Sequence, residues 1–160
     1  MKNWIVALGL LSSICYFGCS KTAPSTPACT NVFPFDDSTV LLKFADDNSI
    51  YAKFDSSGIF YQILDSGLTT AKPNQYSGLH VNYIGKTMDN AIFDSATNSN
   101  LGGYQLGQLI WAWQFGLSKI GVGGHIRLLV PSAYAYGCNG YLTIQPNSPL
   151  YFDITLLSIY

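Results

Sequence analysis

The hydrophobic positions of this chain predict two helices, because apolar residues recur every three or four positions in two segments. In residues 36–47 the apolar face consists of Val40, Leu41, Phe44 and Ala45. In residues 109–120 it consists of Ile110, Trp113, Leu117 and Ile120. Asp37 and Ser38 are residue types that cap helices, so we expect the first helix to begin there and to end near Asn48. The glycine-rich residues 121–124 end the second helix.

Four other segments predict strands. Residues 58–64 and 125–130 are rich in branched and aromatic side chains, residues 79–84 alternate between apolar and polar, and residues 150–159 form a long apolar strand pattern. Asp89 and Asn90 predict a tight turn, and residues 97–103 predict a loop because they consist mainly of Asn, Ser and Gly. Several strands around one central helix favour an α+β fold, an antiparallel twisted sheet wrapped around one main α-helix, with a short N-terminal helical extension.

The first residues have the pattern of a targeting segment. Lys2 supplies a positive charge, residues 4–17 form an apolar run that is short for a membrane span, and Gly18 precedes Cys19. This order resembles a bacterial lipobox, although Tyr16 stands where Leu is usual. We therefore expect a signal peptide at residues 1–18 and lipid attachment at Cys19; an ordinary signal peptide with an incidental Cys19 is the alternative.

The remaining chain divides by composition into three parts. Residues 19–35 are rich in Pro, Ser and Thr and predict a tether. Residues 36–57 contain the first helix, and residues 58–160 are long enough for one domain with a core. Cys29 and Cys138 are then the only thiols left in an exported protein, so a disulfide between them is one interpretation and two unpaired cysteines the other.

Charge and metal-ligand patterns narrow the classes of function. After Cys19 the chain has seven Lys and Arg against nine Asp and Glu, without a basic stripe, which argues against nucleic acid as a partner. No Cys/His spacing predicts a metal site. We interpret His80 and His125 as surface or structural residues, and residues 121–124 as a turn because they follow a helix instead of a strand.

Residues 80–160 resemble the FKBP-type peptidyl-prolyl cis-trans isomerases over essentially the whole of that family's domain. The motif positions that carry the resemblance are Tyr83, Phe93-Asp94-Ser95, Leu106-Gly107, Trp113, Gly116, Val122-Gly123, Pro131, the run from Ala133 to Gly137, Pro146-Asn147 and Phe152-Asp153. The resemblance implies a sheet curled around a helix with a pocket between them. It also implies that the protein catalyses rotation about Xaa-Pro bonds and needs no cofactor for this.

The resemblance also implies a role for individual residues. Trp113 corresponds to the indole under the prolyl ring, Tyr136 to a hydroxyl that donates to a ligand carbonyl, and Asp94 to a carboxylate at the pocket edge. Ile144 corresponds to a residue of the loop over the ligand. The remaining wall positions are Tyr83, Phe93, Leu109, Ile110 and Phe152.

Some positions depart from the family pattern. Gly102 or Gly103 stands where many relatives have a further aromatic residue, which predicts one thin wall. Gln145 replaces a proline, and Tyr141 lies near a position that is His in some relatives, in a loop about two residues shorter. Trp111 is additional and is expected to be exposed, as plain surface or as a contact for clients.

The leading hypothesis is a monomeric isomerase of the bacterial cell envelope, lipid-anchored on the periplasmic side or at the outer membrane. Its partners would be proline-containing polypeptides, the membrane and the macrolide inhibitors of the family. One alternative is a non-catalytic binding module or chaperone that kept the pocket. Another is a surface lipoprotein that contacts partners through Trp111 and Tyr141.

Overall fold

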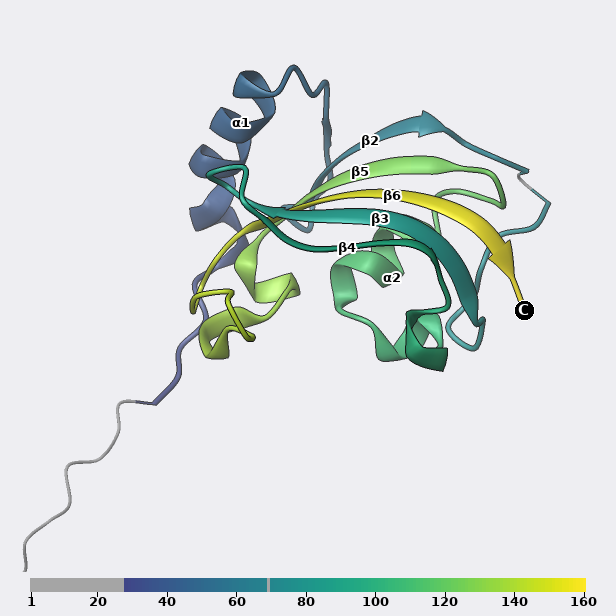
Figure 1. The fold of residues 1–160 in the computed structure, drawn as a ribbon. Helices are drawn as coiled ribbons and strands as arrows, with labels where there is room; N and C mark the ends of the chain where they lie inside the picture. Colours follow the sequence, from purple (N-terminus) through teal and green to yellow (C-terminus); the bar gives the residue numbers. More distant parts are fainter. Residues whose placement is uncertain (1–27, 69) are drawn as a thin grey trace, which may run out of the picture.

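A six-stranded antiparallel sheet in the order β1-β2-β5-β6-β3-β4 organises the computed structural model, which describes residues 28–68 and 70–160. The signal peptide and Cys19 expected from the sequence lie outside the described residues. The strands are β1 (Lys53–Phe54), β2 (Phe60–Asp65), β3 (Leu79–Thr87), β4 (Ile92–Ser99), β5 (His125–Val130) and β6 (Leu150–Ile159). Figure 1 shows the sheet curving over α2 (Trp111–Leu117), with α1 (Ser38–Asp47) near one end of the sheet.

The described residues also contain five short 3-10 helices. They are η1 (Pro34–Asp37), η2 (Leu101–Gly103), η3 (Leu106–Gln108), η4 (Ser132–Tyr134) and η5 (Gly137–Asn139). The predicted α+β architecture is confirmed, including the helix ahead of the domain. Within the two described stretches, no helix has both the length and the apolar composition that a membrane crossing needs.

The sheet has a core on each face because side chains alternate along its strands. On the α2 side, Leu128 and Phe152 pack with Trp113 and Leu117 in the larger core. On the other side lies a smaller core, and Phe44 contributes to it from α1. Its other buried members are Leu41, Ala45, Ile50, Phe60, Leu129 and Tyr151. The N-terminal extension is therefore packed onto the sheet, and β1 pairs with β2.

The second helix is shorter than residues 109–120. Leu109 (ψ 168°) and Ile110 (ψ 147°) have extended backbones, so α2 begins only at Trp111. It ends at Leu117, because the next turn closes with 3-10-type bonds, from Lys119 N–H to the Gly116 carbonyl and from Ile120 N–H to the Leu117 carbonyl. Ile120 is nevertheless fully buried, so the apolar spacing identified a core residue that lies beyond the end of the helix.

Two further predictions were wrong in detail. Residues 97–99 belong to β4 instead of a loop, and the Asn98 N–H donates to Asn82 Oδ1 on β3 at 2.8 Å. Asp37 does occupy the N-cap of α1, but its side chain makes no capping bond. Its carboxylate instead accepts bonds from Ser132, 95 residues away in the sequence.

Candidate functional site

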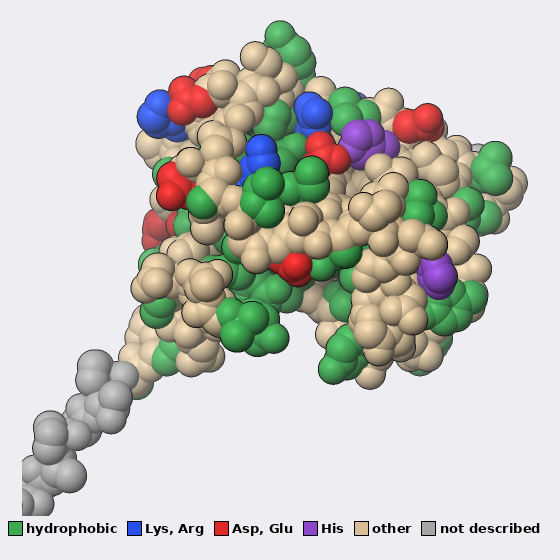
Figure 2. Space-filling view, in the orientation of Figure 1, with side chains coloured by type: hydrophobic (Ala, Val, Ile, Leu, Met, Phe, Trp, Pro, Cys, Tyr) green, Lys and Arg blue, Asp and Glu red, His purple; other side chains and the backbone are tan. Residues whose placement is uncertain are grey.

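A hollow of about 540 Å³ opens between the concave face of the sheet, the start of α2 and two loop regions. Figure 2 shows the molecule indented at its lower edge, with hydrophobic side chains on both sides of the indentation. The residues that line the hollow are Tyr83, Asp94, Ser99, Leu101, Gly102, Tyr104, Gln108, Leu109, Ile110, Trp113, Tyr136, Tyr141 and Phe152. Most are aromatic or aliphatic, so the hollow suits an apolar group.

Trp113 forms the base of this hollow. It lies in the first turn of α2 and is only 5% exposed. The rings of Tyr83 and Phe152 meet the indole edge-on, with centroids 5.2 and 5.6 Å away. Edge-to-face packing of this kind fixes ring orientation. Leu109 and Ile110 precede the helix in extended conformation and complete the apolar side.

A polar edge crosses the hollow from β3 to β4. The Tyr83 hydroxyl donates a hydrogen bond of 2.6 Å to Asp94 Oδ2. Burial raises the pKa of Tyr83, and the bond to Asp94 raises it further. Burial also raises the pKa of Tyr136, and the charges of Asp94 and Tyr141 add to the effect. Both hydroxyls therefore stay protonated at neutral pH. The Tyr83 proton is used in the bond to Asp94, and the Tyr136 hydroxyl keeps a proton that it can donate to a ligand.

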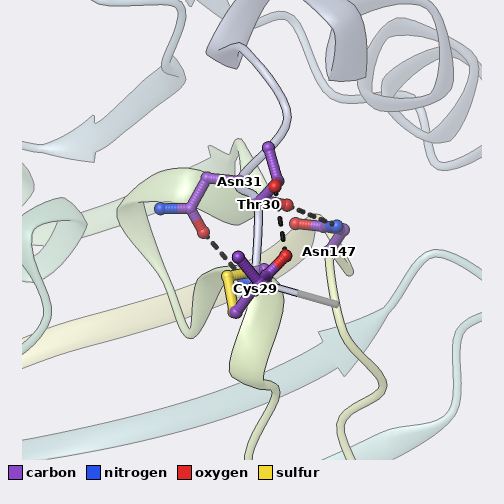
Figure 3. Close-up of a disulfide and its surroundings, with 6 residues drawn as sticks. Cys29, Thr30, Asn31 and Asn147 are labelled. Atoms are coloured by element: carbon purple, nitrogen blue, oxygen red, sulfur yellow. Dashed lines mark hydrogen bonds between the residues drawn. A yellow bond between two sulfur atoms is a disulfide. The ribbon is translucent and has the colours of Figure 1, made fainter. Parts of the chain in front are cut away.

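Tyr136 and Tyr141 form the opposite wall. Their rings stack with centroids 5.1 Å apart and an interplanar angle of 12°. Both belong to residues 131–147, which we call the wall segment. Cys138, two positions after Tyr136, is bonded through its sulfur to Cys29, with Cα atoms 5.5 Å apart. Figure 3 shows this disulfide beside Thr30, Asn31 and Asn147.

Seven of the nine site residues expected from the sequence line the hollow, and two do not. Phe93 packs edge-on against Phe152 at 5.7 Å, so its ring lies behind the wall that Phe152 forms. It lines a separate hollow between the β3–β4 turn and the chain around Gln145. Ile144 is 5% exposed and belongs to the larger core. Its backbone bonds to Tyr141 in both directions, so it anchors the loop that carries that ring.

The wall that we expected to be thin at Gly102 and Gly103 is occupied by a residue that the sequence analysis did not assign. Tyr104 lines the hollow, and its ring lies 3.7 Å from the position that a Cβ on Gly102 would take. Leu101 and Gln108 were also missed. The signal was weak, because Tyr104 follows two glycines and is displaced from the motif position.

Trp111 and the two histidines lie outside this lining. Trp111 is 44% exposed and its ring packs on Tyr134 at 4.5 Å. His80 contacts Asn98 Oδ1 at 3.2 Å. His125 Nε2 lies 2.5 Å from Asp153 Oδ1, on the face of the sheet that looks away from α2. Among residues 28–68 and 70–160, no group of three His, Cys, Asp or Glu could hold a metal ion.

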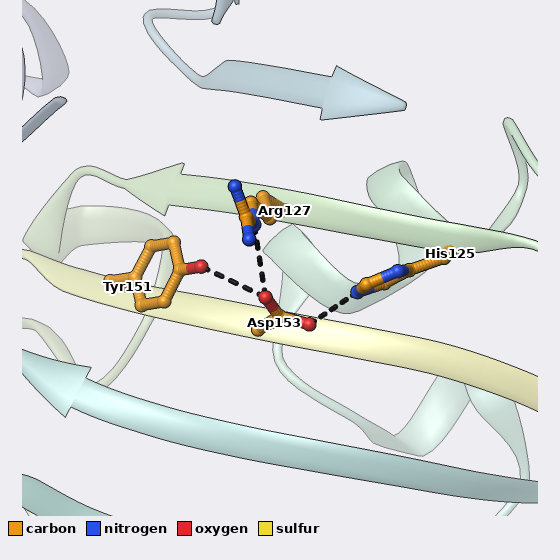
Figure 4. Close-up of polar contacts among 4 residues, drawn as sticks. All are labelled: His125, Arg127, Tyr151 and Asp153. Carbon is orange, nitrogen blue, oxygen red and sulfur yellow. Dashed lines mark hydrogen bonds and ion pairs between the residues drawn. The ribbon is translucent and has the colours of Figure 1, made fainter. Parts of the chain in front are cut away.

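Asp153 is the centre of a polar network on that outer face (Figure 4). Its Oδ2 accepts bonds from Arg127 Nε at 3.0 Å and from the Tyr151 hydroxyl at 3.1 Å. Burial alone would raise the pKa of Asp153, but the bonds from His125 and Arg127 outweigh it and hold the pKa below its usual value. The network joins β5 to β6 and is separate from the hollow.

A family profile and individual relatives place the similarity in the same family. The sequence profile of the FKBP-type peptidyl-prolyl cis-trans isomerases matches residues 69–157. FKBP-type peptidyl-prolyl cis-trans isomerase FkpA of Escherichia coli K12 is 36% identical over 118 residues, which is 73% of this chain and 43% of that protein. FkpA of Aeromonas hydrophila is 35% identical over 108 residues, 67% of this chain and 40% of that protein.

Solved structures agree in fold. The crystal structure of FkpA from Escherichia coli matches with a TM-score of 0.64 and 32% identity, covering 78% of this chain and 59% of that one. A peptidyl-prolyl cis-trans isomerase from Pseudomonas syringae pv. tomato matches with a TM-score of 0.63 and 27% identity, covering 81% and 98%. The chain spans less than half the length of the two FkpA sequences above.

Proposed function

The chain belongs to the FKBP-type peptidyl-prolyl cis-trans isomerases, and from this we propose that it accelerates rotation about Xaa-Pro bonds in polypeptides. The observation that carries the proposal is the hollow over Trp113, which combines aromatic walls with two protonated hydroxyls. The family match and the geometry of the hollow favour the same reaction.

The chemistry needs little from the protein. Rotation about an Xaa-Pro bond is slow because amide resonance opposes it, with a barrier of roughly 18–20 kcal/mol. The twisted amide has lost its resonance charge separation and depends less on hydration than the planar form does. An apolar hollow therefore favours the twisted bond over either planar isomer, which is the condition for catalysis.

Named side chains would divide this work. The prolyl ring would rest on Trp113, between Tyr83 and Phe152. The Tyr136 hydroxyl would donate to a carbonyl next to the bond, because its own proton is retained at neutral pH. Asp94 would act through Tyr83, whose hydroxyl it fixes at 2.6 Å. No cofactor takes part in this scheme.

The test is NMR exchange spectroscopy on an Xaa-Pro peptide with catalytic amounts of the purified protein. Trp113→Ala should abolish the acceleration, whereas Trp111→Ala, a change of the same size two residues away, should retain it because Trp111 does not line the hollow. Tyr136→Phe, which removes only a hydroxyl, serves as the second site variant in case Trp113→Ala does not fold. A folded wild-type chain that leaves the exchange rate unchanged would favour the alternative of a non-catalytic binding module.

We also propose that the protein is exported and lipid-anchored through Cys19 to the cell envelope, as a monomer that acts on proline-containing clients and binds macrolide inhibitors of the family. The support is the lipobox-like order of Gly18 and Cys19. Mass spectrometry of the protein from bacterial membranes should find a lipid-modified N-terminal cysteine. Cys19→Ser should release the protein into the soluble fraction, and an unmodified wild-type N-terminus would contradict the proposal.

A further inference from the structure

Four residues that precede α1 hold the wall segment, residues 131–147, at both of its ends. We call Cys29, Thr30, Asn31 and Asp37 the N-terminal clamp. Three of them act at the far end of the wall segment, beyond Tyr136, and one acts at its start. Cys29, Thr30, Asn31 and Asp37 all lie outside residues 69–157, the part of the chain that matches the family.

At the start of the wall segment, the Asp37 carboxylate is the contact. Its Oδ2 accepts a bond of 2.7 Å from the Ser132 N–H and another of 2.8 Å from the Ser132 hydroxyl. Both residues are buried, and Ser132 has no exposed surface. Bonds from neutral donors to a buried carboxylate are among the stronger hydrogen bonds in proteins, so this end is fixed firmly.

Beyond Tyr136 the contacts are denser (Figure 3). Asn31 Oδ1 accepts a bond of 2.7 Å from the Cys138 N–H, and the Cys138 sulfur is bonded to Cys29. The Asn147 side-chain amide donates to the Thr30 carbonyl at 3.2 Å. Three separate links therefore join three consecutive clamp residues to the wall segment.

Asn31 also approaches the backbone directly next to Tyr136. Gly137 has a φ of +56°, a conformation that side chains disfavour, and a Cβ there would collide with Asn31 Oδ1. The residue that follows Tyr136 is thus packed against the clamp with no space between them. A shift of Asn31 would reach Tyr136 through one peptide unit, and a shift of the disulfide would reach it through two.

Apart from the clamp, the wall segment is held by a few backbone bonds and by side chains such as Ile144 that pack into the larger core. It contains two three-residue 3-10 helices and one bridge between Tyr141 and Ile144, and none of it belongs to the six-stranded sheet. Two of its three tyrosines, Tyr136 and Tyr141, form one side of the hollow. Short elements without ladder bonds open more readily than strands do, so their position depends on contacts from outside.

We propose that Asn31 and the Cys29–Cys138 pair are positioning residues, which hold Tyr136 and Tyr141 in place for the prolyl substrate. The inference rests on the proposed function for its substrate. It adds to the site residues from a part of the chain outside the family match. A loosened wall must be ordered again whenever a peptide binds. The apparent affinity is then reduced in proportion to the fraction of molecules whose wall is in place, while the exchange rate at saturation changes little.

The experiment compares the wild-type chain with Asn31→Ala, Asn31→Asp and the pair Cys29→Ser with Cys138→Ser. Peptide titration by NMR gives the dissociation constant and the exchange rate at saturation for each. Asn31→Ala should weaken peptide binding about fivefold, the factor that one lost hydrogen bond gives, and should leave the saturated rate within twofold. Asn31→Asp keeps an acceptor at the same atom and should restore binding. The serine pair should weaken binding at least as much as Asn31→Ala.

Amide hydrogen exchange on the same samples gives a readout that does not depend on activity. The Cys138, Tyr141 and Asn147 amides are all hydrogen-bonded in the wall segment, and they should exchange faster in Asn31→Ala while the strand amides keep their protection. Faster exchange in a chain whose wild type proves inactive would support the clamp and overturn only the isomerase proposal. Unchanged protection and unchanged peptide affinity in Asn31→Ala would overturn the clamp and leave the isomerase proposal intact. Asn31→Ala needs no change to the disulfide, so a serine pair that failed to fold would not affect either conclusion.

Discussion

Replacing Asp153 by Asn should lower the free energy of unfolding by about 2 kcal/mol at pH 7. The substitution keeps the shape of the side chain but removes its charge and one of its two acceptors. Three donors from β5 and β6 then lose a carboxylate partner, namely His125, Arg127 and the Tyr151 hydroxyl. Breaking a hydrogen bond to a charged group costs roughly 1.5–3 kcal/mol.

Partial exposure limits the cost to about one such bond instead of three. The side chains of His125 and Arg127 are 32% and 30% exposed, so water can take over part of their bonding. The Tyr151 hydroxyl has less access to water, because Tyr151 as a whole is only 6% exposed. The figure of about 2 kcal/mol is therefore the loss of one charge-assisted bond with modest contributions from the other two.

Urea denaturation measures this difference, and a matched variant provides the control. Asp47 pairs with Lys43 at 2.8 Å on an exposed face of α1, with side chains 56% and 73% exposed. Asp47→Asn should change stability by less than about 0.5 kcal/mol, because water and salt screen such pairs. Both variants should keep the wild-type m-value. Equal unfolding midpoints for the wild type and Asp153→Asn would refute the reasoning, since they would mean that burying the Asp153 charge costs as much as its bonds return.

The pH dependence gives a second check on the same pair of proteins. The folded pKa of Asp153 lies below its unfolded value, so its contribution is complete above the unfolded pKa and disappears as the pH falls through the folded one. The stability difference between wild type and Asp153→Asn should therefore persist at pH 5 and shrink below about pH 4, near the ordinary Asp pKa. A difference that grew steadily toward pH 3 would have the wrong sign.

Three further changes have expected outcomes. Tyr83→Phe removes the donor to Asp94 and should lower kcat/KM about fivefold in the peptide exchange assay with unfolding by urea unchanged within about 1 kcal/mol. Gly116→Ala should destabilise the fold by about 1–3 kcal/mol in urea, despite the better helix propensity of Ala, because the added Cβ would lie 2.6 Å from Leu128 Cδ1. Tyr104→Ala should weaken peptide binding in the NMR titration with little effect on stability, because the ring is 57% exposed on the rim of the hollow.

The strands that the sequence predicted best are the two at the centre of the sheet, β5 and β6. The bounds of β5 and β6 agree with the predicted residues 125–130 and 150–159, because alternate residues from Ile126 to Val130 and from Leu150 to Leu156 are apolar and buried on the α2 side. β4 was not predicted as a strand, because an edge strand facing solvent carries the Asn, Ser and Thr residues that also mark loops. Burial, and not strand pairing itself, is what the apolar pattern reports.

The site was predictable to the extent that backbone position determines it. Trp113, Tyr83 and Tyr136 meet at the hollow because their strands and helix converge there. Phe93 and Ile144 were assigned to the same set, but Phe93 lines the neighbouring hollow and Ile144 is buried in the larger core. Sequence position alone does not fix these side-chain directions. Contacts between distant segments could not be predicted from the sequence either. The position of Asp37 before a helix predicts a capping residue, but in the structure its carboxylate accepts bonds from Ser132.

Disrupting the Asp153 network and disrupting the N-terminal clamp should have different consequences. Phe152 and Asp153 are adjacent on β6 and point to opposite faces, so the strand that supplies a wall of the hollow is tied to β5 by the network behind it. That network joins ladder strands that stay paired without it, so losing Asp153 should cost stability while the folded molecules keep their hollow. The N-terminal clamp holds a segment without ladder bonds, so losing Asn31 should weaken peptide binding at little cost in stability. If Asp153→Asn weakened peptide binding as much as Asn31→Ala does, this division of roles between sheet and wall segment would be wrong.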